Sequence, residues 1–346
     1  MYNEKNYFGQ TLYKGTEIMK KSLFYVIIVL FIICLLAGCK KDTNSKDDDE
    51  ISTDFMELTM ATGGTSGTYY SFSEAISKVA NNRFGDIMNI TIASTGASKA
   101  NLQLLDSGEA QLAIVQNDVM AYAYNASDMY KGEKPIKSFT AVAACYPEQC
   151  QIIAVPSIKS IEELRGKRVS VGDAGSGVEF NTRQILEAYN ITFDDIIVVY
   201  KSFADSVESL LNGDVDAIFV TSGAPTTAIT ELASEFAFNM LGIDDEHIKT
   251  IIDKYGYYTS VIIPGGTYDG FSGDVQTVAV MATIVARSDV PSKIINAFTR
   301  CLFEYKFDIT ALHPKGELLD PVTGISGVPV PFHPGASQYY SEAGIK

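Results

Sequence analysis

The sequence predicts an α/β protein with mainly parallel strands, and three observations lead to that class. From Glu57 onward, short β-branched apolar runs alternate with longer stretches of helical periodicity, which is the pattern of β–α–β units. Three of the strand-to-helix junctions are loops rich in glycine, serine and threonine. The 346 residues are 46% hydrophobic and 20% charged. That composition suits about two folded domains and excludes global disorder.

In each of the three junctions, a strand is expected to end at the loop from which a helix begins. The first loop, at 63–68, joins a strand at 58–62 to a helix at 69–80. The second, at 94–98, joins a strand at 89–93 to a helix at 99–106. The third, at 172–177, joins a strand at 168–171 to a helix at 179–189. The first turn of a helix leaves N–H groups unpaired and carries the positive end of the helix dipole, while glycine lets a ligand approach the backbone. We therefore expect the loops to form one anion-binding crevice at the strand ends. For any single loop, a tight turn with a helix cap is the alternative.

The side-chain inventory argues against several classes of protein. The chain has 42 acidic and 27 basic residues and a formal charge of −15, so we expect no basic face for nucleic acid. Three histidines and five cysteines leave little material for a transition-metal site. The three loops lack the lysine of a phosphate-binding P-loop and the G-x-S-x-G pattern of a serine nucleophile. We therefore expect a binding protein, not an enzyme, with no catalytic residue, metal or cofactor.

An export signal is expected near the start of the chain. A short basic segment at 19–21 precedes 14 mostly apolar residues at 23–36, a length that fits a signal better than a membrane-spanning helix. The following L-A-G-C motif resembles the cleavage site of bacterial lipoproteins. We therefore expect residues 1–38 to be removed and Cys39 to be lipidated. An uncleaved membrane anchor is the alternative.

The segments on either side of this signal have separate expectations. Residues 1–18 are either a misassigned start or an extra leader before the signal core at 19–38. Residues 39–54 are polar and charged, and we expect a lipidated, flexible spacer there. Cleavage before Cys39 removes four lysines and two glutamates, which changes the net charge to −17. The expected location is the extracytoplasmic face of the cell membrane, periplasmic or extracellular.

A series of motifs is similar to those of one known family. The segment T-G-G-T-S-G-T-Y-Y at 62–70 resembles the opening motif of the TAXI-type solute-binding proteins of tripartite ATP-independent periplasmic (TRAP) transporters. Similar blocks follow in family order: T-G-A-S at 95–98, S-G-E-A-Q-L-A at 107–113, V-Q-N-D-V at 115–119, L-R-G-K-R-V-S-V-G at 164–172, G-S-G-V-E at 175–179, G-A-P at 223–225 and V-P-F-H-P-G-A at 330–336. Together these blocks span nearly all of the chain after the signal.

The resemblance implies a type II periplasmic-binding-protein fold, in which two α/β lobes joined by a crossing-strand hinge hold a ligand in the cleft. The first lobe would comprise 57–146 and 259–346 and the second 147–258, with crossing strands around 141–155 and 257–263. The implied function is a monomeric receptor of a TRAP-type transporter. It would capture a small carboxylate or amino acid, such as glutamate, by hinge closure and deliver it to a membrane permease. A lipoprotein of an ABC permease and a sensory ligand-binding protein are the alternatives.

The resemblance also implies ligand contacts by position. From the first lobe these are Gly67, Thr68, Tyr69, Ser98, Asn101, Gln116 and Asp118. From the second they are Gly175, Ser176, Gly177, Val178, Gly223 and Pro225. To these we add Arg183, because a guanidinium one turn into the third helix would match a carboxylate if it points inward. A surface ion pair is the alternative for Arg183, and for Asp118 an amine contact and a helix cap both remain open.

Two further features bear on these expectations. The family often has threonine where this chain has Val178, so one hydroxyl contact is missing and the glutamate preference does not transfer directly. Cys145 and Cys150 stand on the expected first crossing strand, where a disulfide requires a turn at Pro147. We favour two buried thiols.

Overall fold

The computed structural model describes residues 55–345. The expected signal at 1–38, the lipidation site Cys39 and the spacer at 39–54 lie outside the described residues. No helix within 55–345 is both long and apolar enough to cross a membrane.

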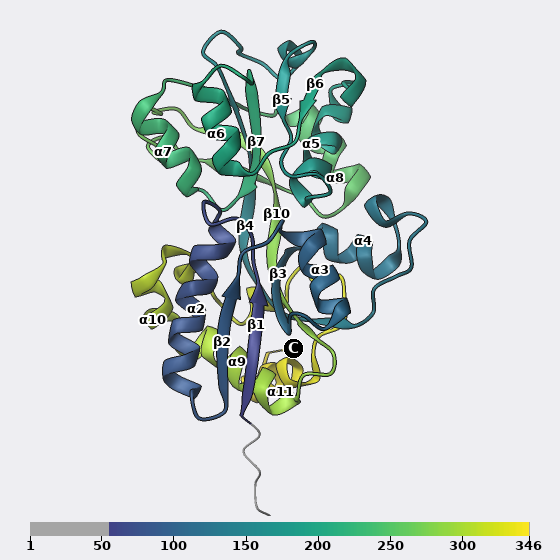
Figure 1. Cartoon of the computed structure of the whole chain (residues 1–346), viewed down its shortest axis with the longest axis vertical. Helices are drawn as coiled ribbons and strands as arrows, with labels where there is room; N and C mark the ends of the chain where they lie inside the picture. The colour runs from purple at the N-terminus through teal and green to yellow at the C-terminus, as the bar shows by residue number, and fades with distance from the viewer. Residues whose placement is uncertain (1–54, 346) are drawn as a thin grey trace, which may run out of the picture. The chain divides into compact units, whose positions relative to one another are not determined.

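Strands and helices alternate along the described chain (Figure 1). The strands are β1 (Met56–Ala61), β2 (Met88–Ala93), β3 (Leu112–Gln116), β4 (Phe139–Ala154), β5 (Arg168–Ser170), β6 (Ile197–Val199), β7 (Ala217–Ser222), β8 (Asn239–Leu241), β9 (Thr259–Ile263) and β10 (Val275–Arg287). The α-helices are α2 (Thr68–Phe84), α3 (Ser98–Ser107), α4 (Asn117–Asn125), α5 (Gly177–Ala188), α6 (Phe203–Leu211), α7 (Thr227–Glu235), α8 (Asp245–Tyr255), α9 (Ser292–Glu304), α10 (Lys306–Leu312) and α11 (Pro334–Glu342). The three predicted strand–loop–helix junctions are confirmed as β1–α2, β2–α3 and β5–α5.

The strands form one sheet with the order β2-β1-β3-β10-β4-β7-β5-β6, while β8 pairs with β4 and β9 with β10. The strand β1 is parallel to β2 and β3, and β5 is parallel to β6 and β7. Between these parallel groups, β4 and β10 are antiparallel to each other and to their neighbours. Figure 1 shows both long strands running from one half of the molecule into the other. We call the half that contains β1–β3 the first lobe, and the half that contains β5–β7 the second lobe.

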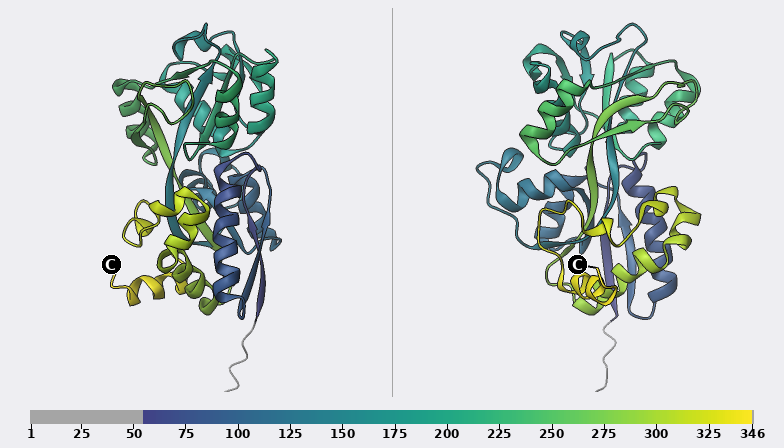
Figure 2. Two further views of the ribbon diagram at one scale, coloured as in Figure 1. Left: turned by 90° about the vertical axis from the view of Figure 1, so that its left-hand side faces the viewer. Right: turned by 180° about the vertical axis from the view of Figure 1, so that it is seen from behind.

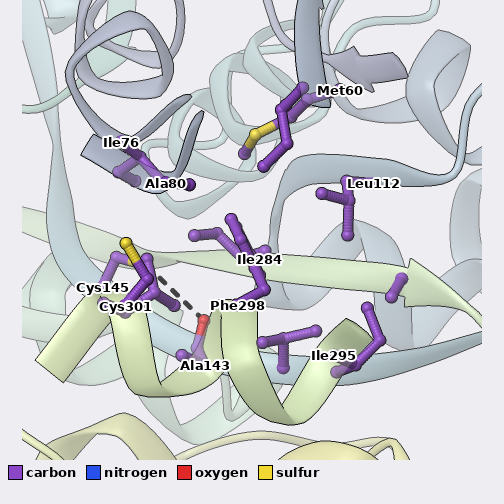
Figure 3. Close-up of a cluster of buried hydrophobic side chains, with 14 of the residues drawn as sticks. Met60, Ile76, Ala80, Leu112, Ala143, Cys145, Ile284, Ile295, Phe298 and Cys301 are labelled. Carbon is purple, nitrogen blue, oxygen red and sulfur yellow. Dashed lines mark hydrogen bonds between the residues drawn. The ribbon is translucent and has the colours of Figure 1, made fainter. Parts of the chain in front are cut away.

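Each lobe packs helices on both faces of its part of the sheet. Successive side chains of a strand point to opposite faces, so Ile114 and Val115 of β3 lie in two different hydrophobic clusters. The cluster with Ile114 includes α2, α9 and α11, and Figure 3 shows its α9 side chain Phe298 beside Ile284 of β10. The cluster with Val115 includes α3 and α4. Full burial of a side chain such as Phe298 stabilises the lobe by about 1.5–3 kcal/mol.

The second lobe repeats this arrangement. One cluster joins α5 and α8 to one face of the sheet, and another joins α6 and α7 to the opposite face. Figure 2 shows these helices on both sides of the strands. Sheets of parallel strands need such cover on both faces, and the central strand β7 is buried along its whole length.

The structure corrects the expected second crossing strand. Within the expected segment at 257–263, residues 259–263 form β9, an antiparallel edge partner of β10 whose residues are mostly exposed or half-buried. The strand that crosses between the lobes is β10, because Val280 lies in the second-lobe core and Ala282 in the first-lobe core. Ile263 packs with α6 and α7, so the stretch after 258, expected in the first lobe, continues the second lobe.

The buried cysteines Cys145 and Cys150 lie on β4 and are free thiols. The strand continues through Pro147 without a turn, and an extended chain advances roughly 3.3 Å per residue, so the two sulfurs cannot reach each other. Cys145 belongs to the first-lobe core, as Cys301 does (Figure 3), and Cys150 to the second-lobe core. Burial raises the pKa of both β4 thiols to about 12, so they are protonated and unreactive.

Candidate solute-binding cleft

A cavity of about 60 Å³ lies between the lobes, where the three predicted loops meet. It is lined by Gly63, Gly64, Ser66, Gly67, Thr68, Tyr69, Thr95, Ala97, Ser98, Gln116, Glu148, Asp173, Ser176, Gly177, Val178, Ser202, Phe203, Thr221 and Ser222. One ordered water needs roughly 10–15 Å³ measured in the same way, so the cavity has room for a small solute group.

The three predicted loops each start a helix at this cavity, and α6 starts there as well, at Phe203. The first residues of α2, α3 and α5 are Thr68, Ser98 and Gly177, and all three line it. The first N–H groups of a helix have no partner within the helix, and each helix start carries a partial positive charge. The cavity therefore offers backbone donors to an anionic group from three directions.

The loop before α5 is built to present its helix start. The Ser176 hydroxyl accepts the Glu179 N–H at 3.2 Å, and the Glu179 carboxylate accepts the Gly175 N–H at 2.7 Å. Gly172 has a φ of +87°, and a Cβ there would lie 2.8 Å from the Val178 Cβ. Only glycine therefore suits position 172.

Asn101 is buried but does not line the cavity. Its side-chain amide donates to the carbonyl of Thr62 at 2.6 Å and to that of Ile114 at 2.8 Å. These bonds tie α3 to the residue that follows β1 and to the middle of β3. Asn101 therefore holds the second loop in position and makes no direct contact with the cavity.

Asp118 also lies outside the cavity, in a buried set of side chains that we call the interlobe network: Gln116, Asp118, Asn181, Gln184 and Tyr258. Asn181 of α5 donates to Asp118 at 3.0 Å and to the Tyr258 hydroxyl at 2.7 Å, and Gln116 donates to Asn181 at 3.1 Å. Tyr258 in turn donates to Gln184 at 2.6 Å. Asp118 is thus neither a cavity contact nor the residue that caps α4, and burial raises its pKa to about 7.

The interlobe network depends on a close approach at Gly177. A Cβ on Gly177 would lie 1.9 Å from the Gln116 Oε1 atom, which belongs to the opposite lobe. That oxygen is buried and has no hydrogen-bond partner. Glycine at position 177 is therefore a condition for the two lobes to meet at this edge of the cavity.

A second set of contacts joins the lobes at the start of α2. The Thr68 hydroxyl donates to the Gly223 carbonyl and accepts from the Ser222 hydroxyl, both at 3.0 Å. Lys315 donates to the Ala224 carbonyl at 2.6 Å. A Cβ on Gly223 would lie 2.7 Å from the Lys315 side chain. Gly223 therefore serves the contact between the lobes and does not line the cavity.

Three other expected contacts do not reach the cavity lining. Arg183 pairs with Glu179 at 3.0 Å and lies over the Phe193 ring, and its side chain is 47% exposed. This is the surface ion pair that was the alternative, because position 183 faces outward on α5. Gly175 and Pro225 are also absent from the lining.

Sequence reasoning missed Glu148, which lies on β4 where the strand passes from one core to the other. It is 2% exposed, lines the cavity, and accepts the Tyr69 hydroxyl at 2.7 Å. Burial raises its pKa well above the usual range. The signal was a carboxylate inside a long and mostly apolar strand, where a buried charged residue is rare unless it is paired.

The lining also includes Ser202 and Phe203, which follow β6, and Thr221 and Ser222, which end β7. Their signal was similar to that of the three predicted loops, since hydroxyl side chains stand between an apolar strand segment and a helix. The patterns at 202 and 221–222 contain fewer glycines, so they did not stand out.

The histidine nearest to a serine hydroxyl does not form a catalytic pair. His313 Nε2 lies 3.2 Å from the Ser71 hydroxyl, while His313 Nδ1 accepts the Lys315 N–H. Nε2 therefore carries the ring proton and donates it to Ser71, so this histidine cannot take the serine proton. Among residues 55–345, no three metal-binding side chains gather at one point.

The sheet order and the interlobe cavity define a two-lobed α/β fold, which two solved structures share with a TM-score of 0.50 or more. A structure described as a periplasmic transporter is 13% identical, with 83% of this chain and 92% of that chain covered and a TM-score of 0.51. A protein from Bordetella bronchiseptica RB50 is 16% identical over 82% and 88% of the chains, with a TM-score of 0.50. The alkanesulfonate-binding protein SsuA from Xanthomonas axonopodis pv. citri, bound to MOPS, is 14% identical over 82% and 83%, with a TM-score of 0.47. The fold is of the predicted type II periplasmic-binding-protein class.

Within this fold class, the sequence identifies the family. A profile described as the NMT1-like family matches residues 60–344, and the chain belongs to that family.

Proposed function

We propose that this protein is an extracytoplasmic receptor that captures a small carboxylate or amino acid and delivers it to a membrane permease. The observation that carries this proposal is the meeting of three helix starts in one cavity between two lobes. An anionic group held there would contact both lobes at once, because α2 and α3 belong to the first lobe and α5 to the second.

Capture would proceed by closure of the two lobes. We propose that the lobes move about β4 between Tyr146 and Cys150 and about β10 between Val280 and Ala282, where each strand passes from one core to the other. The direct contacts between the lobes lie around the cavity, at Thr68 and in the interlobe network. A solute that bridges the lobes would favour the closed state by its greater affinity for that state.

The partner and location follow from the sequence motifs. The blocks shared with TAXI-type receptors support a TRAP-type permease as the partner. The L-A-G-C motif supports a lipid on Cys39 and therefore a place at the outer face of the membrane. A soluble body tethered in this way would need no membrane-binding surface of its own.

Isothermal titration of the full chain, purified in detergent, against a panel of dicarboxylates and amino acids tests the receptor function. We expect at least one small acid to bind with one site per chain. Failure of every acid in the panel to bind would contradict the proposal.

A second experiment tests the choice of permease. The receptor is added to membrane vesicles that contain the permease, and uptake of the bound solute is measured with an ion gradient or with ATP. A TRAP-type partner predicts uptake that needs the gradient and continues without ATP. Uptake that requires ATP would instead assign the receptor to an ABC permease.

A further inference from the structure

The charged side chains that line the cavity are both acidic. Glu148 lies inside the cavity, Asp173 is exposed at the β5–α5 loop, and the lining residues include no lysine, arginine or histidine. Two basic side chains near the cavity have partners outside it. Lys315 donates to the Ala224 carbonyl, and Lys99 pairs with Glu133 at 3.0 Å. A solute with only negative charge would therefore meet a carboxyl group in a lining that contains no basic side chain.

Two buried side chains of the lining, Glu148 and Gln116, present carboxyl and amide oxygens that can accept hydrogen bonds. The Glu148 carboxyl uses one oxygen to accept the Tyr69 hydroxyl. Gln116 is 3% exposed, and its Oε1 has no partner although it is buried. A buried acceptor without a donor is unfavourable, so a ligand that supplies donors would relieve it. The helix starts of α2, α3 and α5 present donors instead.

We propose that the cleft selects solutes that carry a primary ammonium group as well as a carboxylate, and that Glu148 is the residue that determines this selection. The carboxylate faces the helix starts, and the ammonium group faces Glu148 with Gln116 beside it. This inference rests on the proposed function and specifies the class of solute: α-amino acids rather than simple carboxylic acids.

The position of Glu148 suits this role. It lies on β4 at the crossing between the lobes, so it faces the cleft from the hinge. Burial raises the pKa of its carboxyl well above the usual range, and the positive charge of Lys315 acts in the opposite direction. A ligand ammonium group would supply the positive charge that a buried carboxylate requires.

The test compares matched pairs of ligands that differ only in the ammonium group. The full chain in detergent is titrated with L-glutamate and glutarate, L-aspartate and succinate, and L-leucine and 4-methylpentanoate. A charge-assisted hydrogen bond exceeds a neutral one by enough to predict a preference of roughly tenfold or more for the amino acid of the pair that binds. The variant Glu148→Gln keeps the shape and an acceptor but removes the charge, so it should lose most of this preference, and the simple acid should bind at least as tightly as before.

Two further variants separate selection from a general loss of structure. Glu231→Gln changes an exposed carboxylate on α7, outside the cavity lining, and should keep the full preference. Tyr69→Phe keeps the Glu148 charge but removes the hydroxyl that orients it, and should reduce the preference even if Glu148→Gln fails to fold. Equal binding of both members of a pair, unchanged in Glu148→Gln, would overturn the inference and leave the receptor function standing. Binding of no ligand from any pair would overturn both.

Discussion

Replacement of Gly177 by alanine should weaken solute binding without weakening the ligand-free fold. Gly177 is the first residue of α5 and faces Gln116 across the cleft. The added Cβ would lie 1.9 Å from Gln116 Oε1 and 3.1 Å from a Val119 methyl carbon, so either the Gln116 side chain moves or the lobes separate.

The size of the effect follows from the contact that must be lost. Moving Gln116 breaks its 3.1 Å hydrogen bond to Asn181. The net loss is about 1 kcal/mol, rising to about 3 kcal/mol if the Asn181 oxygen stays buried without a donor. Solute binding should therefore weaken roughly 5- to 150-fold. In an open conformation alanine is at least as good as glycine in a helix, so the melting temperature of the ligand-free protein should not fall.

The assay is titration of the variant with the solute that the panel identifies, together with thermal melting of the ligand-free protein. Gly273→Ala is the matched control, because a Cβ there would meet no atom within 4 Å and the loop is outside the cavity lining. It should bind like the original chain. Unchanged affinity in a correctly folded Gly177→Ala variant would refute the reasoning that the lobes must meet at this position.

Three further outcomes are expected. Arg183→Ala should change the solute dissociation constant by no more than about twofold, because the side chain points away from the cleft and a surface ion pair contributes about 0–1 kcal/mol. A larger change measured by titration would show that Arg183 takes part in solute binding. Cys39→Ala should abolish incorporation of labelled fatty acid and release the protein into the soluble fraction, and retention on washed membranes would argue for another anchor. Asp118 has a pKa of about 7 when buried and about 3.9 when unfolded, so the folded state binds more protons between these values. The free energy of unfolding should therefore fall by up to about 4 kcal/mol as the pH rises from 4 to above 7, and urea titrations should show that Asp118→Asn removes this part of the slope; an equally steep slope in the variant would contradict it.

The convergence of the three loops could be predicted from the sequence because each junction is a local pattern. Thr68, Ser98 and Gly177 each follow a strand and a loop rich in small residues, and carboxyl ends of parallel strands meet at one edge of a sheet. Fold class and the meeting of the loops follow from such local signals. They require no knowledge of which strands cross between the lobes.

The rest depends on long-range packing that one sequence does not display. Both β9 and β10 have strand-forming sequences, and only their pairing shows that β10 crosses while β9 lies at an edge. The outward direction of Arg183 is set by how α5 rotates on the sheet, although Glu179 four residues earlier was a signal for a surface pair. Glu148 lines the cavity because β4 passes from the first-lobe core to the second-lobe core at that point, and the strand pattern alone could not reveal where this happens.

Native mass spectrometry of the full chain, purified from its source without denaturation, tests the central claim most directly. The account predicts one adduct per chain with the mass of a small carboxylate or amino acid, lost or strongly reduced in Gly177→Ala and retained in Gly273→Ala. A chain that carries no adduct and acquires none after incubation with the acid panel would contradict the assignment of this cleft as a solute-binding site.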